Sequence, residues 1–265
     1  MEALCCRIGM PEEVTQRLMA LTDPLPDLQK LTVEETWEEG LEEVKAALGE
    51  DPEGMKMLRC MLYCALNARA EYRRLGISEE IYYHTMGCFG RFVREHLESY
   101  GRYGFDRGFW TVRQVSARLF RIGELEYELI CLDGQPVLSL HIPTDVKLHP
   151  PLMRASVEEA REVLSRAFPA YANAPMFCRS WLLSPALREL LPPDSNILAF
   201  QRAFDITPLP TSSTGVILWV FKNPKLSPED YPEDTTLQRN LKAWLLGGRV
   251  FPDARGFLRR DPFRC

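Results

Sequence analysis

The spacing of the apolar residues changes near Gly101 and Gly104, and this change limits the possible folds more than any other feature. Before it, apolar side chains recur at helical spacing, as Trp37, Leu41 and Val44 do in EETWEEGLEEVKAALGE. After it, runs such as LEYELICL and QPVLSLHIP carry the composition and alternation of strands. The sequence therefore predicts helices first and a sheet second.

The second part contains a short hairpin signal, Asp133-Gly134, between two strand-like runs. We expect an α+β protein, with an all-helical N-terminal domain over residues 1–104 and a mixed sheet with flanking helices over residues 105–265. The predicted strands are residues 112–122, 125–131, 136–142 and 175–183, followed by the runs ILAFQRAFDI and TGVILWVF. A helix precedes Phe168, a short one forms at PALRELLP, and a Thr-capped one at TTLQRNLKAWLLGG comes before a short extended tail.

Composition narrows the class of protein. The chain has 265 residues, of which 46% are hydrophobic and 26% charged, and its net charge is −5 without a strongly basic block. This profile is typical of a globular protein and argues against nucleic acid as a partner. No apolar run is long enough for a membrane helix, and MEALCCRIGMPEE lacks the pattern of a signal peptide.

The eight cysteines are scattered and form no Cys-x-x-Cys motif. Cys60 and Cys64 are four residues apart on a predicted helix and could form half of a metal site, but no second half is evident. Reduced thiols in a cytoplasmic protein fit this pattern best, so we expect no metal.

Four stretches of the second part carry a resemblance to known proteins: LSLHIPTDVKLHPPLM, FCRSWLLSP, LLPPDSNILAFQRAF and the predicted strand with Trp219-Val220-Phe221. They are similar to a two-domain bacterial family that joins a helical N-terminal acyltransferase domain to a GNAT-like C-terminal domain. The order of elements after residue 105 also resembles the GNAT N-acyltransferase fold. The resemblance implies acyl-CoA or acetyl-CoA as co-substrate, bound where the fourth and fifth strands of that fold separate, and a small-molecule acceptor.

The segment TDVKLH takes the place of the glycine-containing pyrophosphate loop of that fold, and it contains no glycine. Backbone N–H groups at a helix N-terminus attract phosphate, and Lys147 and His149 could add positive charge, whereas Asp145 opposes it. The resemblance places the cofactor-binding residues at Ile142, Thr144, Val146, Lys147 and His149. The helix that follows has two alternative starts, one at Pro150-Pro151 and one at a Ser156 capping box.

Candidate catalytic residues lie on the two strands beside this loop. His141 ends one strand and could act as general base, and Ser180 shares a face of the other strand with Cys178 and could be a polar contact to substrate or pantetheine. A Cys178–His141 pair would contain the parts of a nucleophilic dyad, although no third residue orients it. Arg202, between two phenylalanines in a predicted strand, could bind an acidic group of the substrate.

The function predicted from these residues is acyl-CoA-dependent transfer of an acyl group to an amine or other small nucleophile by direct attack. Two alternatives remain: a non-catalytic ligand-binding protein on a degenerate GNAT scaffold, and a hydrolase or transferase that uses Cys178. The missing glycine loop, and the absence of a tyrosine from PALRELLP, favour the first alternative. The sequence does not specify an oligomeric state.

Overall fold

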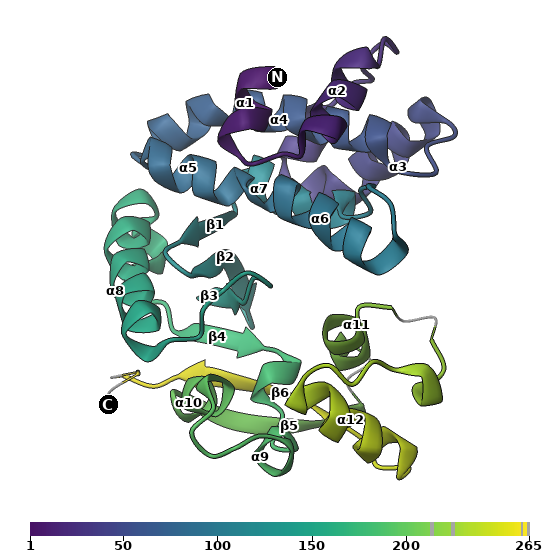
Figure 1. Cartoon of the computed structure of the whole chain (residues 1–265). Coiled ribbons are helices and arrows are strands. Elements are labelled where there is room, and N and C mark those ends of the chain that lie inside the picture. Colours follow the sequence, from purple (N-terminus) through teal and green to yellow (C-terminus); the bar gives the residue numbers. More distant parts are fainter. Residues whose placement is uncertain (213–214, 224–225, 261, 264–265) are drawn as a thin grey trace. The chain divides into compact units, whose positions relative to one another are not determined.

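The computed structural model describes residues 1–212, 215–223, 226–260 and 262–263 (Figure 1). The chain forms two compact units. Unit 1 comprises residues 1–122 with 126–128 and 166–169, and unit 2 comprises residues 123–125, 129–165 and 170–265.

Unit 1 is built mainly from helices, as the apolar spacing predicts. Its α-helices are α1 (Glu2–Arg7), α2 (Glu12–Ala20), α3 (Trp37–Leu48), α4 (Met55–Arg74), α5 (Glu79–Met86), α6 (Cys88–Tyr100) and α7 (Gly108–Val115). Two short 3-10 helices, Gln29–Thr32 and Glu34–Thr36, precede α3. The central helix α4 contacts α2, α3, α5 and α7, so its apolar residues form the middle of this unit.

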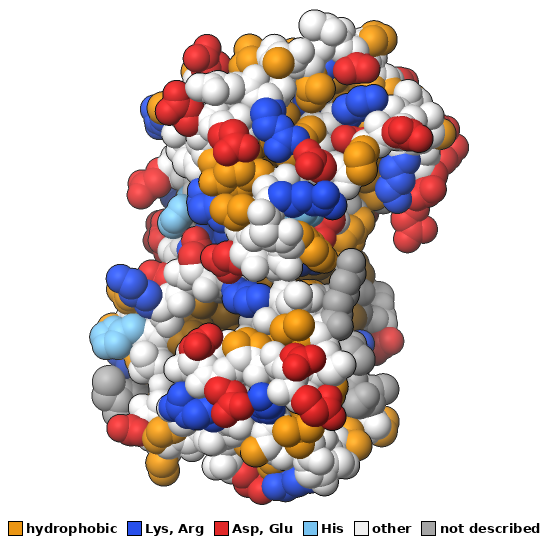
Figure 2. Space-filling model, turned by 45° about the vertical axis from the view of Figure 1, so that its right-hand side comes forward, with side chains coloured by type: hydrophobic (Ala, Val, Ile, Leu, Met, Phe, Trp, Pro, Cys, Tyr) orange, Lys and Arg blue, Asp and Glu red, His pale blue; other side chains and the backbone are white. Residues whose placement is uncertain are grey.

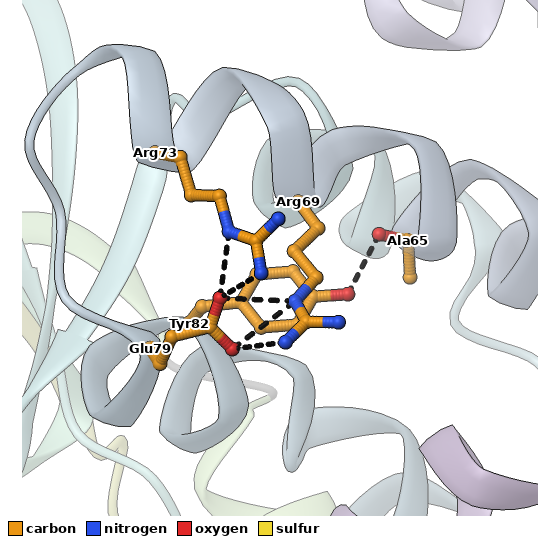
Figure 3. A network of polar contacts seen from close by, with 5 residues as sticks. All are labelled: Ala65, Arg69, Arg73, Glu79 and Tyr82. Atoms are coloured by element: carbon orange, nitrogen blue, oxygen red, sulfur yellow. Dashed lines mark hydrogen bonds and ion pairs between the residues drawn. The ribbon is translucent and has the colours of Figure 1, made fainter.

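A set of polar contacts fastens α5 to α4 (Figure 3). Arg69 Nη2 donates to the Glu79 carboxylate at 2.6 Å, and Arg73 Nε donates to the same carboxylate at 2.8 Å. Beneath this surface network, the buried Tyr82 hydroxyl donates to the carbonyl of Ala65 at 2.8 Å. The turn between the two helices is therefore fixed on its exposed side and on its buried side.

The predicted strand over residues 112–122 is wrong in its first half. Residues 108–115 form helix α7, and only Leu119–Ile122 is a strand, β1. The β-branched Thr111, Val112 and Val115 favour a strand by composition, yet all three are buried on one helical face that packs against α3 and α4. Tertiary packing has overridden local propensity here.

The sheet has six strands in the order β1-β2-β3-β4-β6-β5. The strands after β1 are β2 (Leu125–Leu132), β3 (Gln135–His141), β4 (Met176–Arg179), β5 (Phe204–Ser212) and β6 (Pro252–Leu258). Asp133 and Gly134 join β2 to β3 with φ of 50° and 76°, which confirms the predicted two-residue hairpin. Strands β3 and β4 are parallel, and β6 is antiparallel to both β4 and β5. The sheet is therefore mixed, and the predicted α+β class is confirmed.

The helices of unit 2 flank these strands (Figure 1). They are α8 (Pro150–Ala167, whose last two residues belong to unit 1), α9 (Leu187–Leu190), α10 (Asn196–Arg202), α11 (Gly215–Phe221) and α12 (Thr236–Leu246), with 3-10 turns at Pro169–Tyr171, Trp181–Leu183 and Pro228–Asp230. Helix α12 begins with the predicted threonine cap, since Thr235 and Gln238 form a capping box. Its apolar face joins a core cluster that includes Leu187, Val216 and Phe251.

Two predictions for the last 70 residues are wrong. The run ILAFQRAFDI is mostly helix α10, and TGVILWVF is helix α11, apart from Thr214, which lies outside the described residues. The buried residues Val216, Val220 and Phe221 form one stripe of that helix, although their types suggest a strand. The predicted tail is extended, as expected, and it forms β6, a strand inside the sheet.

Candidate functional site

The pairing of β3 with β4 defines the candidate site in unit 2. The paired positions are Leu138↔Met176 and Ser139↔Phe177, and the Leu138 N–H donates to the Pro175 carbonyl at 3.0 Å. Among the described residues this parallel ladder ends at Ser139, two residues before β3 ends. On its other edge β4 pairs with β6, from Phe177 to Arg179. The pairing of the two parallel strands therefore stops before the carboxyl end of β3, and we call the place where it stops the splay.

The register decides which side chains share a face of the sheet. Paired residues of neighbouring strands point the same way and successive residues alternate, so His141 shares a face with Ser139 and Phe177. Cys178 points to the opposite face, where it is completely buried. Burial raises the pKa of the Cys178 thiol to about 12. The Cys178–His141 dyad is therefore wrong, because the two side chains lie on opposite faces of the sheet.

Ser180 has a structural role at the end of β4. Its hydroxyl accepts the Leu182 N–H at 3.2 Å and caps the short 3-10 helix that follows, while its own N–H donates to the Ala254 carbonyl at 3.1 Å. The contact of Ser180 with substrate or pantetheine stays a prediction. The role of the half-buried His141 as general base also stays a prediction.

The loop over residues 142–149 follows β3 directly. The Thr144, Lys147 and His149 side chains are exposed, and those of Ile142 and Val146 are half-buried. The Lys147 N–H donates to the carboxylate of Glu124 at 3.1 Å, so a carboxylate already occupies one of the donors that a phosphate would use. This contact could not be predicted from the sequence, because the two residues lie 23 positions apart.

Helix α8 begins at Pro150, which confirms the earlier of the two predicted starts. The alternative cap at Ser156 is wrong, because Ser156 is buried in the helix and its hydroxyl accepts the Leu125 N–H at 3.3 Å. Gly123 lies beside it with φ of 57°, and a Cβ there would be 3.0 Å from the Ser156 Cβ. The turn that carries Glu124 is thus held closely against α8.

The start of α8 is poor in hydrogen-bond donors. A helix N-terminus binds anions through the N–H groups of its first turn, and proline has none. Pro150 and Pro151 remove two of these groups, and the Met153 N–H is bonded to the His149 carbonyl at 3.0 Å. Leu152 supplies the remaining N–H of that turn, so an anion beside the loop would depend mainly on the Lys147 and His149 side chains.

Arg202 does not lie in a strand, so its predicted strand position between two phenylalanines is wrong. It is the last residue of α10, its side chain is exposed, and its Nη1 donates to the Pro193 carbonyl at 3.3 Å. Phe200 and Phe204, expected to flank it, are buried with ring centroids 4.9 Å apart. A contact of Arg202 with substrate stays a prediction without that support.

The described residues contain no cluster of metal ligands and no helix suited to cross a membrane. In the part of the chain that the structure describes, no group of three or more His, Cys, Asp or Glu side chains could hold a metal ion. Cys60 and Cys64 are buried in α4, and burial raises their pKa values to about 11 and about 12. Within the same residues, no helix combines the length and the apolar character that a membrane span requires.

Figure 2 shows acidic and basic side chains interspersed over the visible face.

The sequence matches two protein families, one after the other. Residues 1–117 match the N-acyltransferase N-terminal domain, and residues 119–258 match the GNAT-like C-terminal domain. The chain therefore belongs to the family of GNAT-like C-terminal domains, preceded by an N-acyltransferase N-terminal domain. The predicted two-domain architecture is confirmed, and the boundary after residue 104 stays a prediction.

Solved structures show the same fold. An acyltransferase mutant in complex with octanoyl-CoA is 24% identical, with a TM-score of 0.81 over 97% of this chain and 86% of that chain. An acyltransferase in complex with decanoyl-CoA and teicoplanin is 23% identical, with a TM-score of 0.73 over 97% of this chain and 98% of that chain. A search of curated proteins found no match.

Proposed function

We propose that this protein transfers an acyl group from acyl-CoA to a small-molecule acceptor, with an amine as the attacking group. The observation that carries the proposal is the splay between the parallel strands β3 and β4, in a chain of GNAT-like family membership. Structures of the same fold are described with octanoyl-CoA, decanoyl-CoA and teicoplanin. They support acyl-CoA as the donor, medium acyl chains among the candidates, and an acceptor that can be large.

The proposed reaction is a direct attack on the thioester. The acceptor nitrogen forms a bond to the carbonyl carbon, the carbon–sulfur bond breaks, and CoA leaves as a thiolate that takes up a proton. His141, at the end of β3, accepts the proton lost by the nitrogen, either directly or through a water. The backbone of β3 beyond Ser139 holds the pantetheine arm, since its ladder to β4 has ended there. Most of the rate enhancement comes from positioning the two reactants.

The residues of the loop fit the phosphates of acyl-CoA only in part. The exposed Lys147 and His149 side chains offer donors and positive charge. Glu124 competes for the Lys147 N–H, and Pro150 and Pro151 withhold two helix donors. These losses favour a second function, in which the protein binds an acyl-CoA or a related ligand without turnover.

Calorimetric titration with acetyl-, octanoyl- and decanoyl-CoA, with free CoA as control, tests the binding step. We expect an acyl-CoA to bind, and the Lys147→Glu variant to bind it about tenfold more weakly, since a charge-assisted contact contributes about 1.5–3 kcal/mol. Lys45→Glu is the matched control, because Lys45 is an exposed lysine of α3 in unit 1. Lack of binding by every acyl-CoA would refute acyl transfer and would leave the second function only for a ligand other than acyl-CoA.

Mass spectrometry of acylated products from a panel of amines tests the chemical step. We expect His141→Gln to lower kcat about 100-fold or more while acyl-CoA binding is unchanged, because general base catalysis contributes about 10²–10⁴. Full activity of this variant would exclude His141 as the base. Tight binding of acyl-CoA with no product from any amine would support the second function.

A further inference from the structure

The exposed face of strands β4 and β6 carries an unusual set of four side chains. The register pairs Phe177 with Phe257 and Arg179 with Arg255. Because paired residues share a face and alternate residues return to it, all four side chains point the same way. The opposite face of these strands carries Met176, Cys178 and Ala254, which are buried. We call Phe177, Arg179, Arg255 and Phe257 the arginine–phenylalanine face.

The aromatic half of this face is open to solvent. The rings of Phe177 and Phe257 lie 5.3 Å apart between centroids, with 56° between their planes. Phe257 is 44% exposed, and Phe177 is half-buried. An exposed aromatic pair in the interior of a sheet offers apolar area and ring faces to a planar ligand.

The charged half has an unbalanced arrangement. Arg179 and Arg255 are direct cross-strand partners, and like charges in this position destabilise a sheet. Arg179 Nη2 lies 3.2 Å from Asp253, whereas the exposed Arg255 has no ion-pair partner within the described residues. On the neighbouring strand, Asp205 is paired with Arg259 at 2.9 Å. These three arginines and two aspartates leave one positive charge uncompensated.

The position of the face connects it to the splay. Phe177 is the β4 partner of Ser139, and His141 lies on the same face two residues further along β3. Neighbouring strands are about 4.8 Å apart. A ligand stacked on Phe177 therefore lies one strand spacing from the row of β3 side chains that ends in His141. Strands β3, β4, β5 and β6 all belong to unit 2.

We propose that the arginine–phenylalanine face is a binding site for a small molecule that carries an aromatic ring and a carboxylate. Its ring stacks on Phe177 and Phe257, and its carboxylate accepts hydrogen bonds from the Arg255 guanidinium, whose fork matches a carboxylate. Its role as the acceptor site rests on the proposed function. If the bound molecule carries an amine between its ring and its carboxylate, that amine points toward the splay.

The test uses L-phenylalanine, which has a ring, a carboxylate and an amine. 2-Phenylethylamine lacks the carboxylate, and L-alanine lacks the ring. Binding to the full chain is measured by saturation-transfer NMR without acyl-CoA. We expect L-phenylalanine to bind the wild type best, and about tenfold more weakly after Arg255→Gln, because a hydrogen bond to a charged group contributes about 1.5–3 kcal/mol. Binding of 2-phenylethylamine should not respond to Arg255→Gln, and Phe257→Leu should weaken both aromatic probes.

Two controls keep the test interpretable. Arg188→Gln removes an exposed arginine of α9 and should leave every probe unaffected. Arg255→Gln should not lower the melting temperature, because it relieves the repulsion with Arg179 and breaks no ion pair within the described residues. Equal binding of the three probes, or L-phenylalanine binding that ignores Arg255→Gln and Phe257→Leu, would overturn the proposal.

Other occupants of the face give distinct results. If a second copy of the chain covers it, sedimentation shows a dimer that Phe257→Leu weakens, and the proposal is wrong. It is also wrong if Arg255→Gln weakens decanoyl-CoA binding and leaves L-phenylalanine binding unchanged, because the face then belongs to the donor. If no acyl-CoA binds but L-phenylalanine binding depends on Arg255, the proposed function falls and the binding site stands.

Discussion

Replacing Gly123 with alanine should destabilise the protein more than replacing Gly134, although both glycines adopt a positive φ. The left-handed conformation costs a residue with a Cβ about 1–2 kcal/mol, and this cost applies to both positions. At Gly134 nothing lies within 4 Å of the added Cβ. At Gly123 the Cβ would lie 3.0 Å from the Ser156 Cβ and 3.1 Å from its Cα.

These distances are shorter than the usual 3.5–4.0 Å between carbon atoms, so α8 or the turn must move by a few tenths of an ångström. The Leu125–Ser156 hydrogen bond, already 3.3 Å long, would then weaken, at about 0.5–1.5 kcal/mol. We therefore expect Gly123→Ala to lower the free energy of unfolding by about 1.5–3.5 kcal/mol, against about 1–2 kcal/mol for Gly134→Ala.

Urea denaturation followed by far-ultraviolet circular dichroism measures both losses under one condition. The informative quantity is their difference, because the conformational cost is common to the two variants. A Gly123→Ala variant that is as stable as Gly134→Ala would refute the close packing of this turn on α8. It would also weaken the reason for placing Glu124 beside Lys147.

Three further predictions concern other parts of the molecule. Tyr82→Phe should lower the free energy of unfolding by about 1 kcal/mol through loss of a buried hydrogen bond, measured in the same denaturation assay, and an unchanged value would contradict that bond. Hydrogen bonds from Arg69 hold the pKa of Glu79 below its usual 4.5, so their stabilisation is complete above that pH and is lost as pH falls through the folded-state pKa. The melting temperature should therefore fall less steeply between about pH 6 and pH 3 in Glu79→Gln than in the wild type, and identical profiles would argue against the network. Native thiol labelling at neutral pH should modify the exposed Cys131 and spare Cys178, whose pKa is about 12, and rapid labelling of Cys178 would show that its strand opens.

The helical character of residues 1–100 could be predicted because the helices there bury stripes of apolar residues that are visible in the sequence. The failures came where residue type and spacing disagreed. In α7 and α11, β-branched and aromatic residues suggested strands, but their buried positions follow the helical period. Strand β6 was missed for the opposite reason: PDARGFL looks too polar for an interior strand. It is tolerated because one face of the sheet is open there, so Arg255 and Phe257 point to solvent.

For the candidate site, the sequence located the strand that ends in His141 and the start of α8. It could not fix the register between β3 and β4, and that register decides which side chains share a face. The contact of Glu124 with Lys147 was also beyond reach, since it depends on how the turn after β1 meets the loop. The positions of elements along the chain were thus easier to predict than contacts between residues on different strands.

The insertion of β6 between β4 and β5 has a consequence for synthesis of the chain. Strands β4 and β5 leave the ribosome before residues 252–258, yet within the described residues β5 pairs with β6 and with no other strand. Until β6 arrives, their backbone groups form unpaired edges, which other chains can pair with. The half of the sheet that carries the arginine–phenylalanine face can therefore form only after synthesis has passed residue 258. A nascent chain stalled before that point should be prone to aggregation, and a chaperone that covers strand edges should improve its yield.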